Sequence, residues 1–194
     1  MRKITFDIET RNTFQDVGST ESSALDISVV CIHDSLTDEY TSYLQEDLPK
    51  LWPIIEQADM LITFNGDHFD IPLLNKYYSG DLTKIKSLDL LVEVRNSLGR
   101  RIKLDTLAEA TLGKNKSGHG LDAITWWQQG DIEKLIKYCI EDVKITKEIY
   151  EYALKNGKLK YKDLGAGGTV RDIKLDTSKW EMKNESAMTF TLPF

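Results

Sequence analysis

The sequence predicts an α/β fold in which a mixed central sheet is flanked by helices. Three observations lead to this prediction. Short β-branched segments alternate in polarity near the start of the chain, later segments carry apolar residues at helical spacing, and residues 60–64 form a continuous apolar run typical of a buried parallel strand. With 194 residues, of which 41% are hydrophobic, the chain is long enough to bury the core of one domain.

The first expected strand covers residues 4–10 and ends with two acidic residues. Side chains at positions i and i+2 of a strand point to the same side, so Asp7 and Glu9 are expected to project together. Adjacent carboxylates repel each other, and a cation bound by both would remove this repulsion. The alternative is that the strand simply reaches solvent at this point.

The next segments extend the sheet on one side of the first strand. Residues 11–26 are polar and predict a long loop, while residues 27–33 and 38–44 predict two strands joined by a turn. We expect these strands to continue the first one as an antiparallel meander. A helix is expected from residue 47, because Pro49 fits its first turn and the following apolar residues have helical spacing.

Residues 60–64 are expected to form a fourth strand, parallel to the first, that leads into a helix near Asp70. Asp70 would then lie at the carboxyl end of a parallel strand, where open α/β sheets bind their ligands. The alternative is that Asp70 only caps the helix, which Pro72 in the first turn supports. Residues 87–91 predict a last short strand, so the expected sheet has three antiparallel strands followed by two parallel ones.

Three further helices are expected after this strand. They cover residues 104–112, 121–129 and 131–155. A loop is expected over residues 113–120. In the last helix Tyr138 and Asp142 are four residues apart and therefore share a face. The alternative roles are packing in the core for Tyr138 and an ordinary solvated carboxylate for Asp142.

Three motifs, taken in this order, resemble those of the DEDD 3'-5' exonuclease superfamily, also called DnaQ-like, which has an RNase H-like fold. The motifs are Asp7-Ile8-Glu9-Thr10, Asn65 to Asp70, and Tyr138 to Asp142. The likeness is strongest to the exonuclease domain of family B DNA polymerases and to stand-alone YprB-type ribonuclease H-like domains. Tyr138 stands four residues before the last aspartate, as in the Tyr-type branch of the superfamily. The position that holds a histidine in the other branch is Lys137.

The resemblance implies a two-metal nuclease site. It carries the role of metal ligand onto four carboxylates: Asp7, Glu9, Asp70 and Asp142. Hard oxygen ligands suit Mg²⁺ or Mn²⁺, and two such ions per site would activate a water molecule and stabilise the leaving 3' oxygen. The resemblance gives Tyr138 the role of orienting this water, since tyrosine is a poor general base at neutral pH.

The expected substrate is single-stranded DNA or RNA with a free 3' end. Thr10 and Asn65 occupy motif positions that resemble substrate-contacting ones, and Phe14 and Phe69 are aromatic residues able to stack on terminal bases. The choice between DNA and RNA depends on contacts to the 2'-hydroxyl, and the residue types in this sequence do not indicate such contacts. One alternative is a non-catalytic nucleic-acid-binding module on the same fold. Another is an aspartate-nucleophile phosphatase, which would need an aspartate in place of Glu9.

Composition and net charge argue against some other classes of protein. The net charge of −6 argues against a protein that holds nucleic acid by bulk charge, although residues 81–120 carry eight Lys/Arg against five Asp/Glu. This local excess predicts either a solvated face or a phosphate track. Cys31 and Cys139 lack the spacing of a zinc site and predict buried free thiols, and no run of ~18 apolar residues indicates a membrane span. We therefore expect a soluble, intracellular protein of the cytoplasm with no membrane partner.

The chain is expected to divide near its last helix. Residues 1–157 would form the RNase H-like exonuclease domain, and residues 158–194 a C-terminal extension. The glycine cluster at 164–168 predicts a linker, since it lacks the Gly-Lys-Ser/Thr ending of a phosphate loop. The uncharged end at residues 186–194 predicts either an edge strand docked on the domain or a short motif for a replication or repair protein partner.

Overall fold

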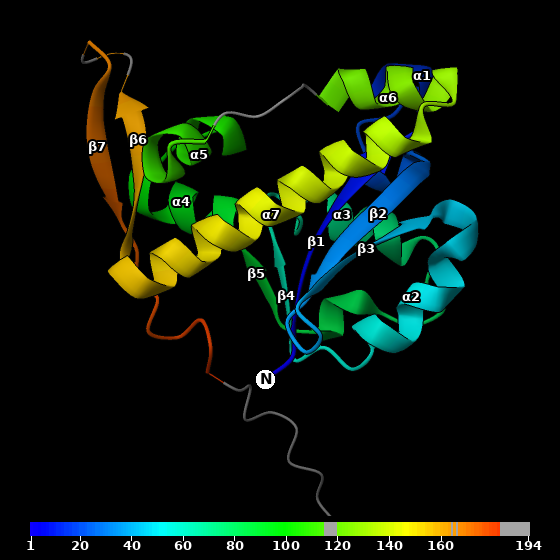
Figure 1. Cartoon of the computed structure of the whole chain (residues 1–194), viewed down its shortest axis with the longest axis horizontal. Helices are drawn as coiled ribbons and strands as arrows, with labels where there is room; N and C mark the ends of the chain where they lie inside the picture. Colours follow the sequence, from blue (N-terminus) through cyan, green and yellow to red (C-terminus); the bar gives the residue numbers. More distant parts are fainter. Residues whose placement is uncertain (115–119, 164, 166, 183–194) are drawn as a thin grey trace, which may run out of the picture.

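A five-stranded mixed sheet forms the centre of the computed structural model, which describes residues 1–114, 120–163, 165 and 167–182 (Figure 1). The strands are β1 (Lys3–Thr10), β2 (Ile27–Asp34), β3 (Glu39–Leu44), β4 (Met60–Thr63) and β5 (Ser87–Asp89), in the spatial order β3-β2-β1-β4-β5. β1 pairs antiparallel with β2 and β2 with β3, whereas β1 pairs parallel with β4 and β4 with β5. The predicted sheet of three antiparallel strands followed by two parallel ones is therefore confirmed.

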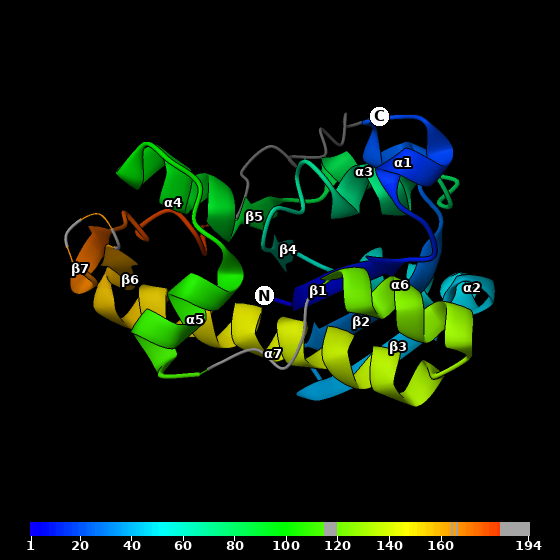
Figure 2. The same ribbon diagram turned by 90° about the horizontal axis from the view of Figure 1, so that it is seen from above.

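Helices cover both faces of this sheet. They are α1 (Phe14–Val17), α2 (Leu48–Ile55), α3 (Asp70–Asn75), α4 (Leu90–Leu98), α5 (Leu104–Leu112), α6 (Gly120–Gln129) and α7 (Ile132–Asn156), with 3₁₀ turns at Ser22–Ala24, Gln45–Asp47 and Leu82–Lys84. Figure 2 shows α5, α6 and α7 on one side of the strands and α3 and α4 on the other. The three helices predicted after the last strand match α5, α6 and α7 to within one residue at each end. α1 and the first 3₁₀ turn lie within residues 11–26, so that predicted loop is partly helical.

β1 lies between two parts of the core because its side chains alternate in direction. Ile4, Phe6 and Ile8 are buried in a cluster that also contains residues of α2 and α3. Asp7 is paired with Cys31 in the register of β1 and β2, and Cys31 packs against residues of α7. The acidic side of β1 therefore faces α7.

The segment that begins at Ser87 is a strand for three residues only, so the strand predicted over residues 87–91 is too long. α4 begins at Leu90, and the Asp89 carboxylate caps it by accepting hydrogen bonds from the backbone N–H groups of Leu91 and Val92. The apolar residues on both sides of Asp89 are also typical of one continuous strand, which led to the longer strand prediction.

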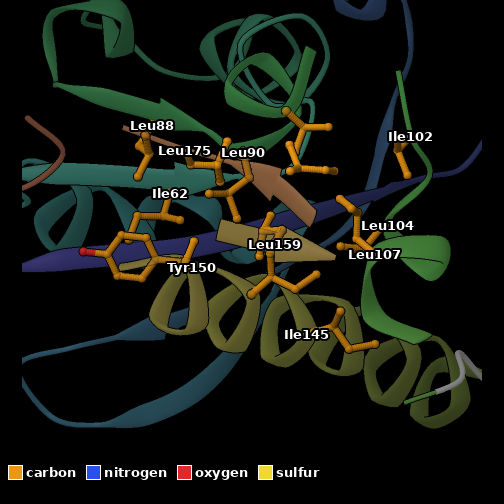
Figure 3. Packing of buried hydrophobic residues seen from close by; sticks show 14 of the residues in the cluster. Ile62, Leu88, Leu90, Ile102, Leu104, Leu107, Ile145, Tyr150, Leu159 and Leu175 are labelled. Carbon is orange, nitrogen blue, oxygen red and sulfur yellow. The ribbon is translucent and has the colours of Figure 1, made fainter. Parts of the chain in front are cut away.

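A two-stranded hairpin follows α7 and includes part of the glycine cluster predicted as a linker; residues 164 and 166 of that cluster lie outside the described residues. Its strands are β6 (Lys158–Asp163) and β7 (Thr169–Lys174), which pair antiparallel. Leu159 of β6 is buried in the same cluster as Ile62 of β4 and Tyr150 of α7, as Figure 3 shows, and Ile173 of β7 belongs to this cluster too. The hairpin contributes to the core because alternate side chains of its strands face the domain.

The boundary predicted at residue 157 stays a prediction, although the segment after it packs on the domain that precedes it. The ring of Trp180 is buried and stacks on Tyr150, with centroids 5.9 Å apart. Its Nε1–H group donates a hydrogen bond of 3.1 Å to Glu93 of α4. The predictions for residues 186–194, and most of the loop predicted at 113–120, lie outside the described residues.

Candidate metal centre and substrate cavity

Three of the predicted metal ligands meet where α7 crosses β1. Asp7 and Glu9 come from β1 and Asp142 comes from α7, and one carboxylate oxygen of each lies within 4.8 Å of the others. The Asp142 side chain is 3% exposed, which contradicts the alternative of an ordinary solvated carboxylate. Glu9 is also buried, so this end of β1 does not simply reach solvent.

The chemistry of these donors fits a divalent cation. Carboxylates at such a separation repel each other, and the repulsion is stronger in a buried site than in water. A cation held between them would remove the repulsion, and carboxylate oxygens are the hard donors that Mg²⁺ and Mn²⁺ prefer. Asp7, Glu9 and Asp142 are therefore the residues in the described part of the chain that would hold such an ion.

Asp70, the fourth predicted ligand, reaches the same strand from the opposite layer. It is the first residue of α3 and is buried, and its Oδ1 atom accepts a hydrogen bond of 3.1 Å from the backbone N–H of Ile8. The N-cap position of α3 belongs to Phe69, so Asp70 is not the N-cap residue. Its carboxylate thus lies against the backbone of Ile8, between Asp7 and Glu9 in the sequence. Asp70 is not part of the cluster of three carboxylates that meet within 4.8 Å.

The pKa of Asp70 reflects this buried position. The pKa of Asp70 is raised to about 7, mainly by burial; the hydrogen bond from the Ile8 N–H group opposes this shift, and the nearby charge of Asp89 adds to it. A buried carboxylate is costly to ionise unless a positive charge compensates it. The position of Asp70 is therefore compatible with a neighbouring cation.

Asp89 organises the turn that leads into α3, a role that sequence reasoning misses. Its Oδ1 atom accepts a hydrogen bond from the backbone N–H of Asn65 at 2.8 Å, and its Oδ2 atom accepts one from Asp67 at 3.2 Å. Asn65 has a φ of 75°, a left-handed conformation that asparagine tolerates better than most residues. A Cβ atom at Gly66 would clash with the Thr63 side chain, so this turn requires glycine. The helical spacing of the apolar residues in α4 is the signal that could have marked Asp89 as an N-cap.

Tyr138 and Asp142 lie one turn apart on α7, as predicted, and Cys139 lies between them. The Tyr138 side chain is buried, and its ring meets the ring of Trp126 edge to face, with centroids 5.4 Å apart. The thiol of Cys139 donates hydrogen bonds to the Asp7 backbone carbonyl at 3.5 Å and to Asp7 Oδ2 at 3.7 Å. Burial raises the pKa of this thiol well above its usual range. Cys31 and Cys139 are both buried free thiols, as predicted.

A cavity of about 400 Å³ opens beside Glu9. Thr10, Phe14 and Phe69 line it, so it brings together three of the four residues predicted to contact substrate. The two phenylalanine rings meet edge to face, with centroids 6.1 Å apart. The fourth residue, Asn65, is not among the described lining residues, and its Oδ1 atom accepts a hydrogen bond of 2.6 Å from Arg101.

Three basic residues of the segment 81–120 make separate contacts within the described structure. Lys86 donates hydrogen bonds to backbone carbonyls of the segment that contains Trp180, and Lys114 forms an ion pair with Glu148 of α7. Arg101 is the one that meets a predicted substrate residue, Asn65. Whether this segment forms a solvated face or a phosphate track stays a prediction.

Most of the chain matches a known protein family, and part of it is similar to DNA polymerases. A profile of the RNase H superfamily matches residues 4–154 of the chain. The DNA polymerase of Thermococcus aggregans is 31% identical over a region that covers 48% of this chain and 7% of the polymerase. The DNA polymerase of Pyrococcus horikoshii is 28% identical over 57% of this chain and 11% of the polymerase. The chain therefore spans a small part of the curated relatives it matches.

A solved structure shares the fold. The family B DNA polymerase from the hyperthermophilic archaeon Pyrobaculum calidifontis matches 79% of this chain and 24% of the polymerase chain, with a TM-score of 0.62 and 16% identity. At this level of identity the likeness concerns the fold alone. Among the described residues, no helix combines the length and apolar character needed to cross a membrane.

Proposed function

This chain belongs to the RNase H superfamily, as its motifs predict, and we propose that within it the chain is a metal-dependent 3'-5' exonuclease acting on single-stranded nucleic acid. The observation that carries the proposal is the meeting of Asp7, Glu9 and Asp142 within 4.8 Å. These side chains come from the first strand and the last long helix, and carboxylates assembled in this way fit a site for divalent cations. The similarity of part of the chain to DNA polymerases supports nucleic acid as the substrate class.

In the proposed mechanism, four carboxylates hold the cations. Asp7, Glu9 and Asp142 would bind Mg²⁺ or Mn²⁺ directly, and Asp70 would supply a fourth carboxylate from the opposite layer. When bound, two such ions activate a water molecule and neutralise charge that develops on the scissile phosphate and the leaving oxygen. The backbone N–H of Ile8 orients Asp70, so that its carboxylate is positioned before any substrate arrives.

Tyr138 has a separate role in this proposal. Its place on α7, one turn before Asp142, supports a hydroxyl group directed at the attacking water rather than at the metal. A hydrogen bond from this hydroxyl would orient the water toward the phosphorus atom. Its ring is held in the core, which limits the directions that the hydroxyl can take.

The cavity beside Glu9 is proposed to receive the base at the 3' end. Phe14 and Phe69 offer ring surfaces, and base stacking on aromatic rings does not depend on the identity of the base. Thr10, at the bulge that ends the pairing of β1 with β2, would contact the terminal sugar. Asn65, which accepts a hydrogen bond from Arg101, would contact the phosphate next to this sugar.

A direct test uses single-stranded oligonucleotides labelled at either end. With Mg²⁺ or Mn²⁺, a 3'-5' exonuclease shortens a 5'-labelled strand stepwise and releases the label of a 3'-labelled strand as a mononucleotide. Matched DNA and RNA strands in the same assay would determine the preferred sugar. Binding without cleavage would contradict the proposal and favour the alternative of a non-catalytic nucleic-acid-binding module.

A further inference from the structure

α6 holds an aromatic side chain against the proposed water-orienting tyrosine. The ring of Trp126 meets the ring of Tyr138 at an interplanar angle of 70°. The ammonium group of Lys134 lies over the Trp126 ring, 4.6 Å from its centroid. Lys134 and Tyr138 are one turn apart on α7, so Trp126 contacts two successive turns on one face of that helix. Figures 1 and 2 both show α6 lying along the N-terminal part of α7.

The backbone of Trp126 is fixed by the turn that joins the two helices. The backbone N–H of Asp131 donates a hydrogen bond of 2.9 Å to the Trp126 carbonyl, and Gly130 makes the turn with a φ of 75°. The Asp131 side chain also caps α7 by accepting a hydrogen bond from the N–H of Lys134. The same turn therefore holds Trp126 and begins the helix that carries Tyr138.

The other end of α6 reaches the cavity beside Glu9. Leu121 and Ile124 line this cavity together with Phe14 and Phe69. Leu121 is 72% exposed, so most of its apolar surface is open to an incoming group. One helix thus contacts both the proposed position of the terminal base and the ring of Tyr138.

We infer that Trp126 is a positioning residue for the reaction: it fixes the ring of Tyr138, and α6 links that contact to the cavity that receives the terminal base. The inference rests on the proposed function. A buried phenol that lost its edge-to-face partner would sample more ring positions, and a displacement of ~1 Å of a catalytic group is enough to slow a reaction by about 10²-fold. Trp126 acts through Tyr138 and does not itself meet the substrate.

The test compares two adjacent tryptophans in the same helix. Trp126→Leu removes the indole ring that contacts Tyr138. Trp127→Leu removes an indole ring of the same size that lies against Arg11, whose guanidinium is 4.4 Å from the ring centroid. Both variants are expected to lower the melting temperature by similar amounts. Trp126→Leu is expected to lower kcat on single strands by roughly 10-fold with little change in KM, because only the orientation of Tyr138 changes. Trp127→Leu is expected to keep the wild-type kcat.

Two further variants separate positioning from general packing. Trp126→Phe keeps an aromatic ring at this place and is expected to retain most of the wild-type kcat. In the Tyr138→Phe background, Trp126→Leu is expected to cause no further loss of kcat, since the hydroxyl that Trp126 orients is already absent. Multiplicative losses in the double variant would overturn the inference.

The remaining outcomes distinguish this inference from the function on which it rests. No turnover by the wild-type protein would overturn both. Wild-type turnover with an unchanged kcat for Trp126→Leu, or with equal losses for Trp126→Leu and Trp127→Leu, would overturn the inference and leave the exonuclease proposal standing. If kcat falls in Trp126→Leu while Mn²⁺ still raises its melting temperature, the positioning role of Trp126 is supported, because the carboxylates then still bind metal.

Discussion

The two halves of α7 bury different kinds of side chain against the same domain. The N-terminal half presents Tyr138, Cys139 and Asp142 to β1 and β2, where three carboxylates meet. The C-terminal half presents Ile145 and Ile149, with other apolar residues, to the cluster that includes the β6–β7 hairpin and Trp180. A polar site and an apolar core therefore occupy one continuous helix of 25 residues.

This difference shows how the fold supports a site that is itself unfavourable. Each fully buried aliphatic side chain in the C-terminal half contributes roughly 1.5–3 kcal/mol, whereas clustered buried carboxylates cost free energy until a cation binds. Because a helix is stiff over several turns, the packing of the apolar half determines where Asp142 lies relative to β1. The hairpin and Trp180 thus stabilise the site without touching it. Four pairs of substitutions, in order of expected effect, test this separation.

Asp142→Asn should affect the N-terminal half alone. We expect turnover to fall on the order of 10³-fold or more, because one cation ligand loses its charge. The rise of melting temperature on adding Mg²⁺ or Mn²⁺ should shrink, while the metal-free protein should be no less stable, since repulsion within the cluster decreases. Thermal unfolding with and without metal, together with an oligonucleotide cleavage assay, measures both effects.

The neighbouring Glu141→Gln is the matched control for Asp142→Asn. It removes a similar charge one residue away, at a half-buried position on the side of α7 that lines a different cavity. Turnover and the metal-dependent shift should stay close to wild type. Parental turnover by Asp142→Asn would mean that the assignment of the metal centre is wrong.

Trp180→Ala should lower stability and leave the turnover of the folded protein unchanged, because the other apolar residues of the cluster still hold α7 in place. Removing this buried ring, which stacks on Tyr150, is expected to lower the free energy of unfolding by about 3–5 kcal/mol. Trp180→Phe, which keeps a ring but loses the hydrogen bond to Glu93, should cost about 1 kcal/mol. Denaturant unfolding measures both values. If folded Trp180→Ala at low temperature turned over more slowly than wild type, the two halves would not be separable.

Tyrosine-to-phenylalanine substitutions compare the two halves directly. Tyr138→Phe is expected to lower kcat by roughly 10²-fold while KM and the metal-dependent shift of the melting temperature stay near wild type. Tyr150→Phe makes the same change in the C-terminal half and removes a hydrogen bond of 2.7 Å to Glu181. It should lower the free energy of unfolding by about 1 kcal/mol with no change in kcat. An unchanged rate for Tyr138→Phe would leave this residue with a packing role only.

Leu121→Ala should have the smallest effect, confined to substrate binding. Its side chain is mostly exposed, so stability should not change, whereas KM for single strands should rise by about 5-fold, equivalent to ~1 kcal/mol of lost apolar contact. Val170→Ala, which trims another exposed apolar side chain on the hairpin, is the control and should change neither quantity. Equal KM values for both variants would argue against a base-binding role for the cavity.

Sequence analysis predicted the features that depend on local backbone geometry. The i, i+2 spacing of Asp7 and Glu9 on β1 follows from the period of a strand, and the shared face of Tyr138 and Asp142 follows from the period of a helix. The strands β1 to β4 and the helices α2, α3, α5, α6 and α7 followed from periodicity and from turn and cap residues in the same way, whereas α1, α4 and the β6–β7 hairpin were not predicted. These predictions succeed because each depends on neighbours in the chain.

The contacts between several distant segments became visible in the folded structure and not in the sequence. The hydrogen bond from Ile8 to Asp70, the packing of the β6–β7 hairpin, and the contact of Trp126 with Tyr138 join residues from separate elements. The division of the apolar run at Asp89 into a strand and α4 also depends on the turn that this carboxylate binds. No local period encodes such contacts, because they arise when the chain closes on itself and side chains from different elements fill the same space.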